Sequence, residues 1–364
     1  MDSSLARNRF LLVYLAFIVL TLSGCNISSS NPLPTYVPTL GIPPTPARIQ
    51  LRSEVPATFT AEPAALEDSE VIQTEELEPT PTLRPTASFS PTPLNIAVNI
   101  YNTVEAPFHR NWPDQIPCES SGYVFKSQFS SEVGGSSRGF HAYLPPCYGT
   151  DNRGFPVIYL IHGSIQDSTH WLKLGLAQYA KAGIEEGRFP PFIAIMPDSG
   201  YLGNISSGGD KSIEGIIVNS LLPFIDQNFC TWSEAGGRTI GGISRGGYWA
   251  LETAFRNPEH FSAAAGHSSH LRLETDPEKY NPLATYALAD LTNLRIWMDR
   301  GEKDFLRVGQ DQLHTNLTTA GIAHEYWVNP GGHSDAYWAE HLGEYLDWHT
   351  AEWPKARELY PLCD

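Results

Sequence analysis

Two segments of the sequence carry a serine between two glycines, residues 135–139 and residues 242–246. A serine in this Gly-x-Ser-x-Gly pattern can attack a carbonyl carbon when the chain turns sharply from a strand into a helix around it. Residues 242–246 meet that condition, because a short strand-like run precedes them and a helix-like run, 248–256, follows. We therefore predict Ser244 as a nucleophile. Residues 135–139 lie in a polar, serine-rich stretch before another strand-like run and are interpreted as a hairpin loop.

A serine hydroxyl needs a base, and the base needs an acid that orients it. Of the twelve histidines, His333 is the best candidate, because it lies on a glycine-rich loop between the last predicted strand and the last predicted helix. Asp304 follows the predicted strand 294–298 on a loop that can reach His333, and we favour it as the acid. Asp299, at the end of that strand, is the alternative, with bracing of the turn as its other role. Asp335 is too close to His333 in sequence to serve easily as the acid that orients it.

The negative charge that develops on an attacked carbonyl oxygen needs two backbone N–H donors. The residue after the nucleophile, Arg245, supplies one of them. The second is expected from the loop after the strand-like run 157–161, where Gly163 lets the backbone face a substrate and Ser164 or Ile165 carries the donor. A plain strand-to-loop turn is the other interpretation of this segment.

Several aromatic and imidazole side chains are candidates for the lining of a substrate pocket. These candidates are Trp171, Tyr201, His267, His270 and Trp338. For the tryptophans and the tyrosine, a place in the hydrophobic core is an equally good interpretation. The two histidines follow the strand-like run that ends at Ala265, close to the expected site.

The elements that must position these residues are apolar runs of strand length alternating with amphipathic stretches. The apolar runs are 157–161, 192–196, 239–240, 261–265, 294–298 and 324–328. Runs that are apolar on both faces are typical of a parallel sheet covered by helices on both sides. The alternation predicts an α/β fold with a mostly parallel central sheet. Walker and Gly-x-Gly-x-x-Gly patterns are absent, so a nucleotide-binding fold has no support.

Composition separates the chain into an N-terminal part and a foldable part. Of the 29 prolines, 13 lie between residues 28 and 94 in a stretch with few aromatic residues. Such a stretch cannot bury enough apolar surface to offset its chain entropy. We predict a tether over residues 25–94 and a single domain over residues 95–364. The net charge of −16 argues against binding to nucleic acid or to anionic lipid.

The first 24 residues are predicted to be a signal peptide. Two arginines precede an uncharged run from residue 10 to residue 22, which is shorter than the roughly 20 residues of a membrane span. The run ends in small residues followed by Cys25, which resembles the lipobox of bacterial lipoproteins. The resemblance implies lipidation of Cys25 and an extracytoplasmic protein anchored to the bacterial membrane through this lipid. An ordinary secretory signal is the alternative.

With Cys25 lipidated, four cysteines remain: Cys118, Cys147, Cys230 and Cys363. An even number in an oxidising compartment favours two disulfides, and three connectivities are possible. We favour Cys118–Cys147, which brackets a predicted hairpin over residues 123–144, and Cys230–Cys363, which would attach the C-terminal segment to the domain.

A set of motifs resembles the esterase D-like family of α/β-hydrolases, which includes feruloyl and acetylxylan esterases, S-formylglutathione hydrolases, siderophore esterases and mycolyltransferases. The motifs are Tyr143-Leu-Pro-Pro146, Leu160-Ile-His-Gly163, Met196-Pro-Asp198, Gly242-Ile-Ser-Arg-Gly-Gly247, Asp304 and Gly331-Gly-His-Ser334. The resemblance covers residues 120–350 and implies the α/β-hydrolase fold, the triad Ser244, Asp304 and His333, and no cofactor or metal. The basic Arg245 departs from many relatives and leaves the preference of the acyl pocket open.

We therefore expect a serine ester hydrolase acting through an acyl-enzyme on acylated polysaccharide or another small extracellular ester. The alternatives are a siderophore or peptide-ester hydrolase, an acyltransferase, and a non-catalytic surface-binding module. Residues 199–209 are rich in glycine and serine, are expected to be mobile, and offer no long apolar run to cover a lipid acyl chain. Hydrolysis of modest acyl groups is therefore favoured over transfer.

Overall fold

One eight-stranded sheet organises the part of the chain that the computed structural model describes, residues 122–133, 137–272 and 276–363. These residues all belong to one unit of the chain, residues 74–364. The predicted signal peptide (1–24), the lipidation site Cys25, the predicted tether (25–94) and Cys118 lie outside the described residues. The predictions made for them stay predictions.

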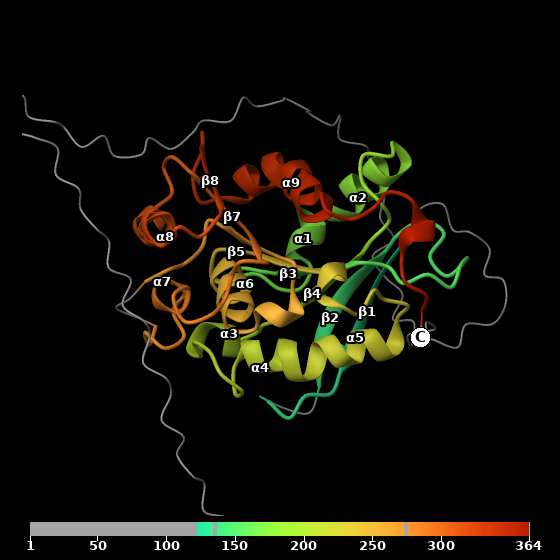
Figure 1. Cartoon of the computed structure of the whole chain (residues 1–364), viewed down its shortest axis with the longest axis horizontal. Helices are drawn as coiled ribbons and strands as arrows, with labels where there is room; N and C mark the ends of the chain where they lie inside the picture. Colours follow the sequence, from blue (N-terminus) through green and yellow to red (C-terminus); the bar gives the residue numbers. More distant parts are fainter. Residues whose placement is uncertain (1–121, 134–136, 273–275, 364) are drawn as a thin grey trace, which may run out of the picture. The chain divides into compact units, whose positions relative to one another are not determined.

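The strand order is β1-β2-β4-β3-β5-β6-β7-β8 (Figure 1). The strands are β1 (Tyr123–Phe129), β2 (Arg138–Leu144), β3 (Val157–Ile161), β4 (Ile193–Pro197), β5 (Arg238–Ile243), β6 (Ala263–His267), β7 (Arg295–Gly301) and β8 (Glu325–Asn329). β2 runs antiparallel to both β1 and β4, and all other pairs are parallel. The predicted mostly parallel sheet is confirmed.

Helices cover both faces of this sheet, as predicted. They are α1 (His170–Lys173), α2 (Leu176–Glu185), α3 (Leu202–Ile205), α4 (Ile213–Ile216), a π-helical turn (Ile217–Leu221), α5 (Leu222–Asn228), α6 (Arg245–Arg256), α7 (Pro282–Thr285), α8 (Arg307–Thr319) and α9 (Asp335–Thr350). Three short 3₁₀ turns lie at Ala235–Gly237, Pro258–His260 and Arg357–Leu359. None of the helices in the described part of the chain is long and apolar enough to cross a membrane.

Strand β3 shows how the two helical layers share one sheet. Successive side chains of a strand point to opposite faces. Val157, Tyr159 and Ile161 pack into one core with α4, α5, α6 and α8. Ile158 and Leu160 pack into a second core with α1, α2 and α9. Figure 1 shows these three helices together on one side of the sheet. Every residue of β3 is buried, which is why this strand is a continuous apolar run in the sequence.

The hairpin of β1 and β2 confirms the interpretation of the first Gly-x-Ser-x-Gly segment. The two strands pair from Tyr123 opposite Leu144 to Phe129 opposite Arg138. Ser137 lies just before β2, and its hydroxyl donates to Oε1 of Gln128 at 2.8 Å. This serine therefore belongs to the hairpin.

The parallel arrangement places six loops at one edge of the sheet. The carboxyl ends of β3, β4, β5, β6, β7 and β8 all point to that edge, where open α/β sheets bind their ligands. The residues predicted to do chemistry follow these strands: Ser164 and Ile165 after β3, Ser244 after β5, Asp304 after β7 and His333 after β8.

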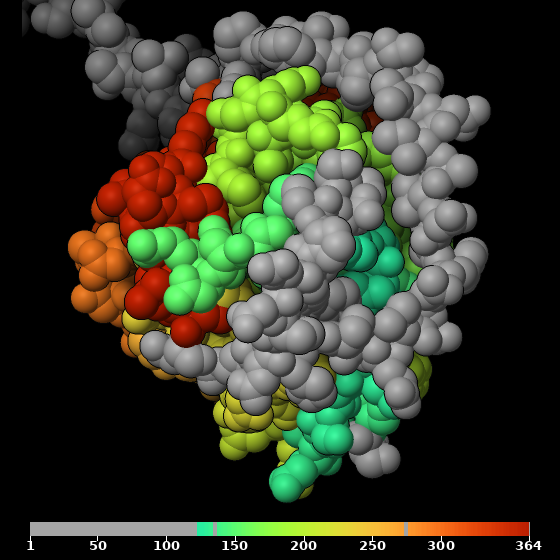
Figure 2. Space-filling model, turned by 90° about the vertical axis from the view of Figure 1, so that its right-hand side faces the viewer, coloured from blue at the N-terminus to red at the C-terminus, as the bar shows by residue number. Residues whose placement is uncertain are grey.

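The C-terminal segment lies against the loop that follows β2. Figure 2 shows the end of the chain, in red, next to green residues of that loop. The amide of Cys363 donates to the carbonyl of Asn152 at 2.7 Å, and Cys363 forms a disulfide with Cys230 across 133 residues of sequence. The predicted Cys230–Cys363 pair is confirmed. Cys147 is also disulfide-bonded, whereas its predicted partner Cys118 lies outside the described residues.

We expect Cys363→Ser to lower the free energy of unfolding by about 2–4 kcal/mol, because the disulfide closes a long loop and restricts the unfolded chain. Urea unfolding under non-reducing conditions measures this loss. The double variant with Cys230→Ser should be no less stable than either single variant, since all three lack the same bond. An unchanged unfolding midpoint in Cys363→Ser would contradict the stabilising role.

Candidate active site

Ser244 occupies a strained turn between β5 and α6. Its φ of 58° and ψ of −118° lie outside the regions that residues other than glycine favour. A Cβ atom at Gly242 would come within 2.1 Å of the carbonyl oxygen of Gly246. A Cβ atom at Gly246 would come within 2.2 Å of the carbonyl oxygen of Ile161. Both obstacles are backbone atoms that cannot rotate away, so the turn requires glycine at both positions.

The backbone of this turn is fixed by the segment that follows β6. The amide of Ser244 donates to the carbonyl of His267 at 2.8 Å, and the amide of His270 donates to the carbonyl of Ser244 at 2.9 Å. A strained backbone conformation persists where several contacts with the surrounding structure hold it in place. These two hydrogen bonds supply such a constraint on Ser244.

His333 lies between Ser244 and Asp304. Its Nε2 atom is 3.0 Å from Oγ of Ser244, and its Nδ1 atom is 3.2 and 3.1 Å from the two carboxylate oxygens of Asp304. An ionised carboxylate can only accept hydrogen bonds, so Nδ1 carries the proton and Nε2 is left to accept from the serine hydroxyl. The structure therefore brings the three predicted triad residues together in the predicted order.

The environment of Asp304 keeps its carboxylate ionised. The side chain is fully buried, and burial alone would raise its pKa. Hydrogen bonds from His333, from the amide of Leu306 at 2.8 Å and from Ser268 outweigh burial and hold the pKa of Asp304 below its usual value. A permanent negative charge therefore faces Nδ1 of His333.

Asp299, the alternative acid, lies inside β7 and accepts hydrogen bonds from side chains of the protein interior. β7 extends to Gly301, beyond the predicted strand end, and Asp299 is fully buried. Its carboxylate accepts from four buried donors: Nδ1 of His267 (2.6 Å), Tyr337 OH (2.7 Å), Tyr345 OH (2.8 Å) and Nε1 of Trp297 (3.1 Å). Burial opposes ionisation of Asp299, but His267 and Tyr337 keep its pKa below the usual value. Among the described residues, no group of three or more His, Cys, Asp or Glu side chains could hold a metal ion.

The loop after β3 runs past the nucleophile. A Cβ atom at Gly163 would lie 3.4 Å from Cβ of Ser244, so the backbone here approaches the serine closely. Ser164 and Ile165 follow and are exposed, Ile165 to 92%. Within the described part of the chain, their amides donate to no other residue. Both amides are therefore free to donate to a bound ligand.

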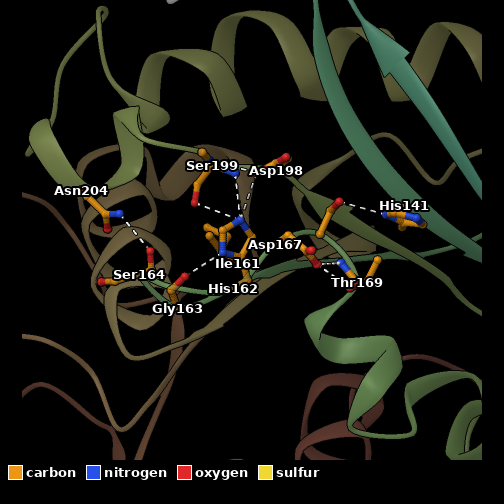
Figure 3. Close-up of polar contacts among 12 residues, drawn as sticks. His141, Ile161, His162, Gly163, Ser164, Asp167, Thr169, Asp198, Ser199 and Asn204 are labelled. Atoms are coloured by element: carbon orange, nitrogen blue, oxygen red, sulfur yellow. Dashed lines mark hydrogen bonds and ion pairs between the residues drawn. The ribbon is translucent and has the colours of Figure 1, made fainter.

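His162 holds this loop in place (Figure 3). Its Nδ1 atom is 2.7 Å from the carbonyl oxygen of Gly163, and its Nε2 atom accepts from the amide of Ser199 at 3.0 Å. On the other side, the amide group of Asn204 donates to the carbonyl of Ser164 at 2.9 Å. The carbonyls of Gly163 and Ser164 are thus engaged from two sides, which fixes the orientation of the peptide groups next to Ser244.

The side chain of Arg245 points into the protein and not into an acyl pocket. Its Nε atom donates to the carbonyl of Gly203 at 3.0 Å, and Nη2 donates to the carbonyl of Ser206 at 2.6 Å. It also forms a buried ion pair with Asp276 at 3.0 Å, and its guanidinium lies 4.0 Å from the ring centroid of Tyr248. The departure from the family pattern is therefore a structural anchor behind the nucleophile.

The segment 199–209, expected to be mobile, is tied to α6 by several hydrogen bonds. Besides Arg245, Nε1 of Trp249 donates to the carbonyl of Gly203 at 2.9 Å. Tyr248 OH donates to the carbonyl of Ser207 at 2.7 Å. Glycine and serine also serve close packing there: a Cβ atom at Gly203 would lie 2.8 Å from Oγ of Ser199.

The prediction that Trp171 and His267 line a substrate pocket is wrong, because both side chains are buried. Trp171 is 1% exposed, and its indole N–H donates to the carbonyl of Ile161 at 3.3 Å. His267 is fully buried, and its ring stacks on Tyr345 with centroids 3.7 Å apart. Both side chains therefore belong to the core beneath the sheet edge.

The other three candidates differ in exposure and in their contacts with the triad. Trp338 is 3% exposed, and its ring meets the ring of His333 edge-on with centroids 4.9 Å apart. His270 is half-buried, with its amide bonded to the carbonyl of Ser244. Tyr201 is exposed at the beginning of α3. Only Tyr201 offers a large exposed ring, whereas Trp338 supports His333 from the interior.

Phe305 is a site residue that the sequence analysis missed. Its side chain is 66% exposed, and its ring lies 4.6 Å from the ring of His333. An aromatic residue directly after the candidate acid, in a loop at the sheet edge, was the available signal. Together with three other exposed apolar side chains at this edge, it forms what we call the apolar rim: Ile165, Tyr201, Ile205 and Phe305.

Comparison with solved structures shows the fold. A solved ferulic acid esterase superposes with a TM-score of 0.59 over 64% of this chain and 99% of that chain, with 20% sequence identity. At this level of identity the likeness concerns the fold alone. It confirms the predicted α/β-hydrolase fold.

Sequence comparison shows the family. The chain is 29% identical over 264 residues to an esterase of Mycobacterium tuberculosis, which covers 59% of this chain and 56% of that protein. It is 31% identical over 149 residues to an endo-1,4-beta-xylanase/feruloyl esterase of Xylanibacter ruminicola, which covers 38% of this chain and 20% of that protein. The chain thus spans about half the length of the mycobacterial relative. The Esterase family model, described as "Putative esterase", matches residues 130–349, a range that contains Ser244, Asp304 and His333. The chain belongs to this esterase family.

Proposed function

We propose that the chain is a serine carboxylic-ester hydrolase that works through an acyl-enzyme on Ser244. The observation that carries the proposal is the position of His333, 3.0 Å from the serine oxygen on one side and hydrogen-bonded to buried Asp304 on the other. A base between a nucleophile and an orienting acid is the arrangement that activates a serine hydroxyl.

In the first half of the reaction, Oγ of Ser244 attacks the ester carbonyl carbon while Nε2 of His333 takes the hydroxyl proton. The tetrahedral intermediate then collapses, the bond to the alcohol breaks, and His333 returns the proton to the leaving oxygen. In the second half, a water molecule attacks the acyl-enzyme with His333 again as base, releasing the acid and regenerating Ser244. Asp304 stabilises the imidazolium in both halves.

The amide of Arg245, at the start of α6, and the amide of Ser164 or Ile165 bind the oxygen that becomes negative. The free amides of the β3 loop and its fixation by His162 and Asn204 support this assignment. Donors held in place before the reaction stabilise the transition state without a reorganisation cost.

The substrate is an ester with a modest acyl group, borne by a polysaccharide or another small extracellular molecule. The apolar rim, of which Phe305 contacts the ring of His333, supports an apolar or aromatic part in one half of the ester, because its four side chains are 60–92% exposed and would lose water on binding. The matching relative named as a xylanase and feruloyl esterase supports a polysaccharide-linked ester.

The enzyme acts outside the cytoplasm and is attached to the membrane through lipid on Cys25. The support is the sequence before this cysteine, an uncharged run that ends in Leu22-Ser23-Gly24. The proline-rich residues 25–94 act as a tether that lets the domain reach substrates away from the membrane surface.

Ser244→Ala should lower kcat for p-nitrophenyl acetate by about 10⁴-fold or more, because no acyl-enzyme can form. The matched control is Ser137→Ala, a serine of the other Gly-x-Ser-x-Gly segment that lies on the hairpin. It should keep wild-type kcat. Steady-state kinetics on both variants decides, and full activity of Ser244→Ala would refute the proposed function.

Asp304→Asn should lower kcat by roughly 10³–10⁴-fold with little loss of stability, because an amide can present an N–H to Nδ1 and select the wrong tautomer of His333. Asp299→Asn should instead lower the melting temperature and leave kcat within a few-fold of wild type, since it loosens the donors of the interior. Kinetics and thermal unfolding of the two variants together test the assignment. The opposite pattern would make Asp299 the acid.

Cys25→Ser should move the active enzyme from the membrane fraction to the soluble fraction of the producing bacterium, because the acyl chains on this cysteine supply the anchor. Cys363→Ser is the matched cysteine variant and should remain in the membrane fraction. Fractionation followed by the esterase assay measures both. Membrane attachment of Cys25→Ser equal to wild type would exclude the lipid anchor.

A further inference from the structure

Ser268 has a backbone conformation that calls for an explanation. It is a fully buried residue other than glycine, and its φ is 51°. Such a conformation is energetically unfavourable and tends to occur at functional sites. Its amide donates to the carbonyl of Asp299 at 2.8 Å, and its neighbours His267 and His270 hold the backbone of Ser244. The turn at 267–270 is therefore already in contact with the nucleophile.

The hydroxyl of Ser268 connects this turn to the acid of the triad. Its oxygen accepts from Nε1 of Trp338 at 3.1 Å, and the hydroxyl makes a hydrogen bond with Asp304. An indole N–H can only donate and an ionised carboxylate can only accept. The direction of both hydrogen bonds is therefore fixed: the indole N–H donates to the serine oxygen, and the serine O–H donates to Asp304.

The same tryptophan contacts the base of the triad. The ring of Trp338 meets the ring of His333 at 84° with centroids 4.9 Å apart. On another side it meets the ring of His170 at 89° with centroids 5.9 Å apart. His170 is itself bonded through Nε2 to Asp335, at 2.9 Å, in the first turn of α9. Trp338 is thus held by packing as well as by its hydrogen bond.

We infer that Ser268 and Trp338 are positioning residues that hold Asp304 and His333 in register with Ser244. Ser268 sets the orientation of the Asp304 carboxylate, and Trp338 fixes both the Ser268 hydroxyl and the plane of the His333 ring. Neither residue reaches the reacting atoms. The inference rests on the proposed function, since it assigns a role within the reaction of the same triad.

The test separates the hydroxyl from the strained backbone. Ser268→Gly removes the hydroxyl and also relieves the positive φ, so the protein should be at least as stable as with Ser268→Ala. Both variants should lower kcat for p-nitrophenyl acetate about tenfold, the scale of one hydrogen bond to a charged group, with KM within about twofold. A purely structural role predicts no loss of kcat in the glycine variant.

Trp338→Phe keeps an aromatic ring and removes the N–H, and it should lower kcat by a similar factor. The double variant Ser268→Gly/Trp338→Phe should lose no more than the worse single variant, because both changes break one chain of hydrogen bonds. The matched control is Trp348→Phe on the same helix. The indole N–H of Trp348 donates to Glu325 at 2.7 Å, so this variant loses a comparable bond elsewhere and should keep wild-type kcat.

Wild-type kcat in Ser268→Gly, or losses in the double variant that multiply, would overturn the inference. Measurements on the full-length protein at a temperature where every variant is folded exclude unfolding as the cause. The result is distinct from a failure of the proposed function. If Ser244→Ala is inactive while Ser268→Gly is fully active, the triad stands and only the positioning role falls.

Discussion

The strained conformation of Ser244 is the constraint on which the rest of the site depends. The turn lifts the serine out of the sheet, and it exists only because Gly242 and Gly246 leave room for backbone atoms that lie about 2 Å from where a Cβ would be. A strained turn needs neighbours that over-determine it. The parallel sheet provides them, because the turn after β6 bonds to Ser244 from both sides.

Hydrogen-bond partners give the two aspartates of β7 and its loop different roles. Both are fully buried and both have lowered pKa values, so charge and exposure alone do not distinguish them. Their partners do. The donors to Asp299 come from the sheet interior and α9, and they fasten layers together. Asp304 lies just beyond the strand, where one donor is an imidazole whose other nitrogen faces the nucleophile. Asp299, a structural carboxylate, and Asp304, a carboxylate of the site, are thus only five residues apart in sequence.

The sequence predicted the sheet and the triad residues because both depend on local patterns. Continuous apolar runs such as 157–161 mark strands buried on both faces, and the ends of parallel strands must meet at one edge. The orientation of a side chain, by contrast, is not determined by the local sequence. Trp171 and His267 are interior because helices cover the face of the sheet on which they lie. The side chain of Arg245 points inward because it binds Asp276 and two backbone carbonyls there. Phe305 was missed because its place directly after Asp304 shows that it is near the acid, but not that its ring is exposed beside His333.

The first turn of α9 joins these separate constraints. Asp335 bonds to His170 beyond the β3 loop, Tyr337 bonds to Asp299 in β7, and Trp338 bonds to Ser268 after β6. A helix is rigid over one turn, so these three contacts cannot shift independently. His333 lies two residues before the helix begins and inherits its position from them. The base is thus placed by the packing of a helix end against α1, β7 and the turn after β6, and the flexibility of its own glycine-rich loop does not have to set the distance to Ser244.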